Sequence, residues 1–250
     1  MSSLNPYEPP PIPEPDSLRA RPVSSDDEYD GPSFRSPLAW GMVCMVLLGL
    51  EILGTTAESY RLLHLYWLQL ESIPSDQLDT EAIASWSSWA SASYIFGLFL
   101  SLTASAWVIA WMFRTHRNLE PLRYRELDSK HIWAILCWLV PVLNLFCPFL
   151  VMREIWWRSF PEAKDTADSA PATHLVFWWW LLRVAAVGTA YLTHLFSSYV
   201  SWPQYYTFLR IFFLSSGFEV VSAILAILII YRISRWQMER YQRIQEAACR

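Results

Sequence analysis

Long apolar stretches separated by short polar ones dominate the chain after residue 36. Four of these stretches approach the ~20 residues that cross a hydrocarbon core about 30 Å thick. They therefore predict an all-α, polytopic integral membrane bundle. The four predicted spanning helices lie at about 37–58, 91–113, 175–195 and 208–231.

A fifth apolar stretch, 132–157, is broken near its middle by Pro141, Asn144 and Pro148. The prolines lack backbone donors, and Asn144 can hydrogen-bond the carbonyls that they leave free. Residues 132–140 would span about 14 Å as a helix, roughly half of the core. We therefore expect a re-entrant hairpin, and the alternative is a fifth, proline-kinked spanning helix.

The distribution of positive charge predicts the orientation. The loop from Arg114 to Lys130 and the tail from Arg232 to Arg250 each carry five Arg or Lys residues, whereas the loop after the first helix has only Arg61 and the turn at 197–207 has none. Basic loops mark the cytoplasmic side. Both termini are then cytoplasmic, and 132–157 must begin and end on that side, as a hairpin does.

The amino-acid composition is typical of a membrane protein, and its variation along the chain distinguishes both ends from the membrane domain. Of the 250 residues, 54% are hydrophobic, only 17% are charged and 15 are Trp, a combination that is unusual in soluble domains. Residues 1–36 are proline-rich and acidic, which predicts a disordered cytoplasmic tail. Residues 233–250 predict a basic helix beside the membrane, separate from the last spanning helix.

Three ionisable residues lie within the predicted spans: Glu51, Arg183 and Glu219. Each costs at least ~2.5 kcal/mol if it faces lipid, so each is expected to face the bundle. The helices that carry Arg183 and Glu219 are predicted antiparallel neighbours, which favours an ion pair between these two side chains. The alternative is an ion or proton path that uses Glu51 and Glu219.

No catalytic signature occurs in the chain. It has no H-E-x-x-H, no G-x-S-x-G, no glycine-rich phosphate loop and no paired-cysteine zinc spacing. The five histidines are scattered, and His116 is interpreted as an interfacial residue and not as a general base. The sequence therefore predicts no enzyme, no cofactor and no metal site.

Two motifs together resemble a known family. The second predicted helix ends in FRTHRNLEPL, and WLVPVLNLFCPFLVMREIWWRS follows. This pairing is similar to the uncharacterised bacterial membrane proteins grouped as domain of unknown function 4328 (DUF4328). The resemblance implies a bacterial inner-membrane (cytoplasmic-membrane) protein, and it implies no activity. The residues that carry it are Arg114, Arg117, Asn118, Trp138, Pro141, Asn144, Leu145, Pro148, Glu154, Ile155 and Trp156.

The leading functional hypothesis is a non-enzymatic scaffold or regulatory module. The loop from Arg114 to Lys130 and the hairpin would bind a protein partner or anionic lipid, with Arg117 and Asn118 capping the hairpin turn. The tail from Arg232 to Arg250 also suits anionic lipid. The alternative is an oligomeric channel or transporter for small solutes, with hairpins lining a path past Asn144. The chain could also bind another protein or further copies of itself. It is not expected to bind nucleic acid.

Overall fold

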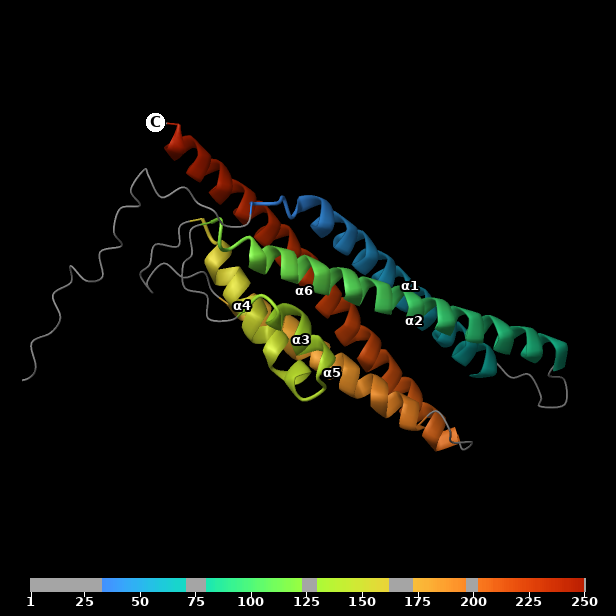
Figure 1. Cartoon of the computed structure of the whole chain (residues 1–250). Helices are drawn as coiled ribbons and strands as arrows, with labels where there is room; N and C mark the ends of the chain where they lie inside the picture. Colours follow the sequence, from blue (N-terminus) through green and yellow to red (C-terminus); the bar gives the residue numbers. More distant parts are fainter. Residues whose placement is uncertain (1–32, 71–79, 123–129, 162–172, 197–201, 250) are drawn as a thin grey trace, which may run out of the picture. The chain divides into compact units, whose positions relative to one another are not determined.

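The computed structural model describes residues 33–70, 80–122, 130–161, 173–196 and 202–249, and all regular structure in these ranges is helical. Residues 1–32 of the predicted tail lie outside the described residues. The elements, labelled in Figure 1, are α1 (Leu38–Leu70), α2 (Thr80–Arg117), α3 (Trp133–Leu139), the short 3₁₀ helix η2 (Leu143–Leu145), α4 (Cys147–Ser159), α5 (His174–Phe196) and α6 (Trp202–Ala248).

Four of the described helices are long and apolar enough to cross a membrane. The predicted all-α membrane bundle is therefore confirmed. Broken into shorter helices, the fifth apolar stretch contributes no such span within the described residues. The candidate spans are Leu38–His64, Ile95–Arg117, His174–Leu195 and Thr207–Ala248.

The helices extend beyond the predicted spans. α1 continues to Leu70, α2 already begins at Thr80, and α6 continues to Ala248. The basic helix predicted separately at 233–250 is therefore the end of α6. No Pro or Gly occurs between residues 218 and 248, so nothing local interrupts the helical hydrogen bonds there.

α6 packs against α5, α1, α4 and α2, and its contact with α1 is very close at Gly41. A Cβ atom on Gly41 would lie 2.8 Å from Ser234 Oγ and 3.3 Å from Ile230 Cγ2. Trp111 of α2 donates a hydrogen bond to the same Ser234 Oγ at 3.2 Å. Only glycine leaves room for this junction of three helices.

The broken apolar stretch folds as two short helices that pack against each other, α3 and α4, with η2 between them. α3 ends where Val140 adopts an extended conformation (φ −96°, ψ 115°), because the following Pro141 disfavours the helical region. Pro148 lies in the first turn of α4, which tolerates its missing donor. Trp180 Nε1 of α5, and not the Asn144 side chain, donates to a carbonyl of the turn, that of Leu145, at 2.9 Å.

Both ends of this stretch lie at the same end of α2. His116, in the last turn of α2, contacts His131 just before α3 and Glu154 in α4. α3 and α4 therefore run away from the end of α2 and back again, as the two limbs of a hairpin do. Their insertion into a bilayer as a re-entrant hairpin stays a prediction.

Candidate functional site

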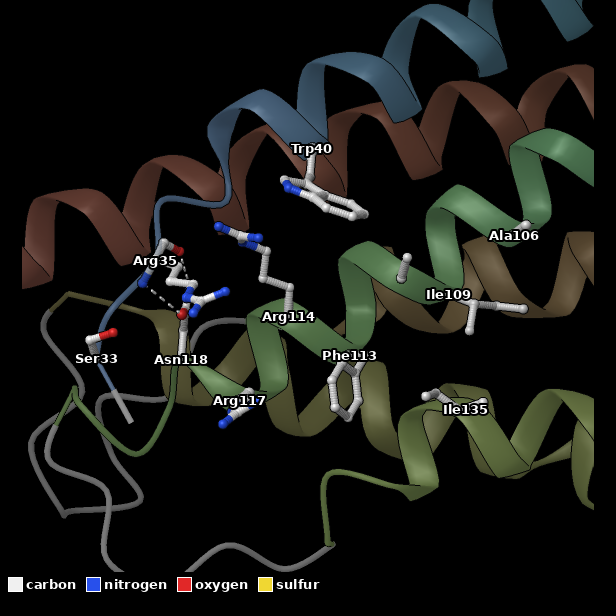
Figure 2. A pocket seen from close by; sticks show the side chains of 11 residues that line it. Ser33, Arg35, Trp40, Ala106, Ile109, Phe113, Arg114, Arg117, Asn118 and Ile135 are labelled. Atoms are coloured by element: carbon white, nitrogen blue, oxygen red, sulfur yellow. Dashed lines mark hydrogen bonds between the residues drawn. The ribbon is translucent and has the colours of Figure 1, made fainter. Parts of the chain in front are cut away.

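A cavity of about 510 Å³ lies beside the last three turns of α2 (Figure 2). The α2 residues that line the cavity recur at the spacing of one helix face. Ala106, Ile109, Ala110 and Phe113 are apolar, and Arg114 and Arg117 follow them along the helix. The cavity thus changes from apolar to cationic along the helix. Ser33, Arg35, Trp40, Asn118 and Ile135 complete the lining.

Positive charge gathers at one end of the cavity, which we call the basic end, where Arg35, Arg114 and Arg117 lie. The Arg114 guanidinium lies 5.3 Å from the centre of the Trp40 ring. Figure 2 shows the two side chains next to each other. Its Nε is buried and has no hydrogen-bond partner within the described part of the chain. None of the described lining residues is acidic, so the lining itself supplies no counter-charge.

Asn118 fixes the segment that carries Arg35. Its side-chain nitrogen donates to the Arg35 carbonyl at 2.8 Å, and the Arg35 N–H donates to Asn118 Oδ1 at 3.3 Å (dashed in Figure 2). The same nitrogen lies 3.1 Å from Gln237 Oε1 of α6. Gln237 in turn donates to the Thr115 carbonyl at 2.9 Å and to Ser159 Oγ at 3.0 Å. This buried network holds α2, α4, α6 and the start of the described chain together.

A second polar cluster, the histidine cluster, consists of Glu120, His131, His116, Glu154 and Arg158. The two facing Nδ1 atoms of His116 and His131 are 2.7 Å apart, His116 Nε2 lies 3.4 Å from Glu154 Oε2, and His131 Nε2 contacts Glu120. Arg158 Nε lies 3.2 Å from the other oxygen of Glu154. Among the described residues there is no group of three or more His, Cys, Asp or Glu side chains that could hold a metal ion.

The residues predicted from the family motif separate into different environments. Arg114, Arg117 and Asn118 lie at the cavity, and Glu154 belongs to the histidine cluster. The expectation that Asn118 caps the hairpin turn is wrong, because its side chain binds the Arg35 backbone and Gln237, and because the ends of the hairpin lie beside this end of α2. Arg117 likewise lines the cavity.

The other motif residues mainly make packing contacts. Trp138 packs edge-on against Trp180, Trp156 packs against Trp236, and Pro148 is buried at the start of α4. Pro141 is exposed. The buried Oδ1 of Asn144 has no donor within the described residues.

The three ionisable residues of the apolar stretches lie near one another. Glu51 and Arg183 line a cavity of about 40 Å³ inside the bundle, together with Trp138 and Ser222. Glu219 has Glu51, Arg183 and Thr55 as its interacting neighbours, and it forms no direct ion pair with Arg183 in the described structure. The predicted ion pair between Arg183 and Glu219 is therefore not formed among the described residues, and the packing of α1 on α6 adds Glu51 to the neighbours of Glu219.

Sequence reasoning missed Arg35, Gln237 and the two histidines as site residues. Gln237 could have been found, since it continues the apolar face of Ile230 and Ile233 at helical spacing and is fully buried. The histidines carry a weaker signal: His116 lies in the last turn of α2, and His131 lies two residues before α3. Arg35 gives no signal, because only its contact with Asn118 brings it to the cavity.

The fold and this site are those of a polytopic helical membrane protein. Its second candidate span ends beside a cavity with a basic end, next to the helical pair α3 and α4. The family described as domain of unknown function (DUF4328) matches residues 75–235, well over half of the chain, and the chain belongs to that family. The recognition made from the two motifs is confirmed. No curated protein and no solved structure matches the chain.

Proposed function

We propose that the protein is a non-enzymatic membrane module, a scaffold or regulator, that binds an anionic phospholipid in the cavity beside α2. One observation carries this proposal: the same helix face changes from small and apolar to cationic in the order in which a lipid changes from acyl chain to phosphate. The positive-inside rule would place the basic end at the cytoplasmic leaflet of a bacterial inner membrane, where anionic headgroups are available.

The dimensions of the cavity suit this ligand. Residues 106–117 of α2 extend over about 17 Å, a length comparable to one leaflet of the hydrocarbon core. Ala106 and Ala110 are small, so an acyl chain can approach the helix backbone, and Phe113 and Ile135 supply apolar walls. A free phosphate ion would leave this apolar part of the cavity without an occupant.

The basic end suits a phosphate. Arginine presents planar, paired donors that match a phosphate. Among the described residues no acceptor faces the buried Nε of Arg114, and a phosphate oxygen would supply one. Each basic residue near a headgroup contributes about 1 kcal/mol, which corresponds to about fivefold in affinity. Three arginines would therefore distinguish strongly between anionic and zwitterionic lipid.

The position of the cavity suggests a structural consequence of binding. Trp40 belongs to α1, Ile135 to α3, and Arg35 to the segment before α1. A lipid that contacts all three would tie the start of α1 and the first limb of the hairpin to α2. The module would thus respond to the lipid composition around it.

The test uses the full chain in nanodiscs of phosphatidylcholine with graded amounts of phosphatidylglycerol, and native mass spectrometry counts the lipids retained. We expect the wild type to retain phosphatidylglycerol and Arg114→Gln to bind it about fivefold more weakly. The matched control is Arg153→Gln, which removes the same charge from an exposed α4 position outside the cavity lining. Ala110→Phe keeps all charges and blocks the apolar part, so it should also weaken retention.

Three results would contradict the proposal. These are a wild type that retains no anionic lipid, an equal loss of lipid in the Arg114 and Arg153 variants, and displacement of the lipid by inorganic phosphate. The second result would mean diffuse charge attraction, and the third a site for a free anion.

A small-solute channel is the second candidate, and the buried, unpartnered Oδ1 of Asn144 within the described residues is the observation in its favour. Its neighbours Val142 and Phe146 are 70% and 68% exposed, which suits contact with lipid better than a water-filled path. A channel predicts solute flux into vesicles reconstituted with the protein, and this flux should change in Asn144→Leu. The absence of flux in the wild type would exclude this function for the tested solutes.

A further inference from the structure

We infer that the small cavity lined by Glu51, Trp138 and Arg183 is a binding site for water, which connects the first limb of the hairpin to the spanning helices. The inference goes beyond the proposed lipid site and concerns a different cavity. It rests on the size of this cavity and on two buried polar atoms of the residues that line it.

The lining of this cavity comes from five helices. Glu51 belongs to α1, Trp138 to α3 and Arg183 to α5. The remaining two helices, α2 and α6, contribute small side chains, among them Ala104 and Ser222. Since α3 is the first limb of the hairpin, the hairpin and all four candidate spans meet at this cavity.

Two atoms at this meeting point have opposite hydrogen-bonding needs. Glu51 is only 7% exposed, and its Oε1 is a buried acceptor that has no donor among the described residues. Trp138 Nε1 is a buried donor that has no acceptor in the same ranges of the chain. Buried polar atoms of folded proteins are almost always paired with a protein group or an ordered water. The two atoms therefore indicate an occupant that both donates and accepts.

Water meets this requirement in size and chemistry. The cavity has a volume of about 40 Å³, and one water needs roughly 10–15 Å³ and about two to four polar partners. Three lining residues carry such partners: Glu51 an acceptor, and Trp138 and Arg183 donors. Ser222 Oγ already donates to the Trp179 carbonyl at 3.3 Å, so it is available to the water as an acceptor.

Other occupants fit this lining less well. A metal ion needs ligands with lone pairs, but Trp138 and Arg183 present only N–H donors. An anion would meet Oε1 of Glu51, which accepts hydrogen bonds as the anion itself does. An apolar group would leave both buried atoms without a partner. The lining therefore favours a small neutral molecule with a donor and an acceptor.

The water has a consequence for the hairpin. A water that accepts from Trp138 and donates to Glu51 links α3 to α1 through two hydrogen bonds. Such a bridge is nearly as favourable in enthalpy as a direct hydrogen bond. It acts next to the edge-on contact of Trp138 with Trp180, whose ring centres are 5.8 Å apart. Hydration of a cavity among the spans thus helps to hold the first limb in place.

The primary test measures the wild-type chain. Solid-state NMR of the full chain in phosphatidylcholine vesicles, with ¹⁵N-labelled tryptophan, detects magnetisation transferred from water protons to each indole N–H group. We expect transfer to Trp138 Nε1–H and none to Trp111 Nε1–H, which is buried and donates to Ser234 Oγ at 3.2 Å. Trp138→Phe and Trp111→Phe assign the two signals. The absence of transfer to Trp138, or equal transfer to both groups, would overturn the inference.

The second test fills the cavity. Ala104→Leu places three more carbon atoms at a lining position that is 1% exposed, and Ala92→Leu is the matched control because Ala92 is exposed on the same helix. We expect the transfer to Trp138 to be lost in Ala104→Leu and unchanged in Ala92→Leu. Unchanged transfer in both variants would overturn the inference, since water would then reach Trp138 by another route.

A third measurement separates water from a cation. Glu51→Gln keeps a side-chain oxygen that accepts hydrogen bonds, so the transfer to Trp138 should persist, whereas Glu51→Leu removes the acceptor and should abolish it. In the wild type, replacing sodium and potassium in the buffer by a large organic cation should leave the transfer unchanged. A transfer that disappears on this replacement would overturn the inference, because the cavity would then hold a metal ion.

Discussion

Gly41 offers the sharpest test of the helix packing, and Gly49 on the same helix is its control. Replacing Gly41 with Ala places a Cβ atom 2.8 Å from Ser234 Oγ and 3.4 Å from Trp111 Nε1. A Cβ atom on Gly49 has no neighbour within 4 Å. Both substitutions add the same methyl group to α1, so they differ only in what that group meets.

The magnitude can be estimated from these contacts. Overpacking a well-packed contact costs about 1–3 kcal/mol, and turning Ser234 away costs about 1 kcal/mol for the hydrogen bond from Trp111. The gain in helix propensity from Gly to Ala is up to about 1 kcal/mol, and it applies to both variants. We therefore expect Gly41→Ala to be less stable than Gly49→Ala by about 2–4 kcal/mol.

Equilibrium unfolding in mixed micelles, followed by tryptophan fluorescence, measures this difference. Ser234→Ala removes the clashing oxygen, so the double variant with Gly41→Ala should recover at least about 1 kcal/mol relative to additivity. The packing described here would be refuted if Gly41→Ala were as stable as Gly49→Ala. Strict additivity with Ser234→Ala would show that the methyl group does not meet this side chain.

Three further predictions concern other parts of the chain. Asn118→Ala removes both hydrogen bonds to the Arg35 backbone and should cost about 1–3 kcal/mol of folding free energy. Trypsin should then cleave after Arg35 faster than in the wild type. An unchanged cleavage rate would show that Asn118 does not hold this segment in place. Arg183→Met removes the cation that lines the same cavity as the buried Glu51 carboxylate, so it should lower the folded yield. Adding Glu51→Gln should restore part of the yield, and no restoration would argue against a shared cavity. Single cysteines placed in 162–172, in a chain without the native four, should react with thiol reagents from the cytoplasmic side, and reaction only from outside would rule out the re-entrant hairpin.

The four long helices and the break in the fifth apolar stretch could be predicted because both are local properties. Apolar length decides whether a segment can cross a bilayer, and a proline acts on the residue before it. Val140 shows this directly, since its extended conformation precedes Pro141. The helices α1, α2 and α6 extend beyond the predicted spans, because apolar length limits only the part of a helix that lies within the bilayer.

The candidate site was predictable only in part. Arg114, Arg117 and Asn118 lie on one helix, so the motif brought them together, but the role assigned to Asn118 was wrong. Its actual partners, Arg35 and Gln237, are separated from it by 83 and 119 positions in the chain. Contacts over such separations depend on how the helices pack, and hydropathy carries no information about that packing.

The sequence by itself determined that this protein is a helical membrane bundle, where its spans lie, and that residues 132–157 cannot form one uninterrupted helix. These features follow from transfer free energies and backbone sterics that each segment has alone. Only the tertiary structure decided that an apolar stripe on α2 ends among three arginines, and that His116 meets both ends of the hairpin. Such contacts depend on how distant segments pack and on how their polar side chains satisfy one another inside the bundle, and neither is a property of one segment alone.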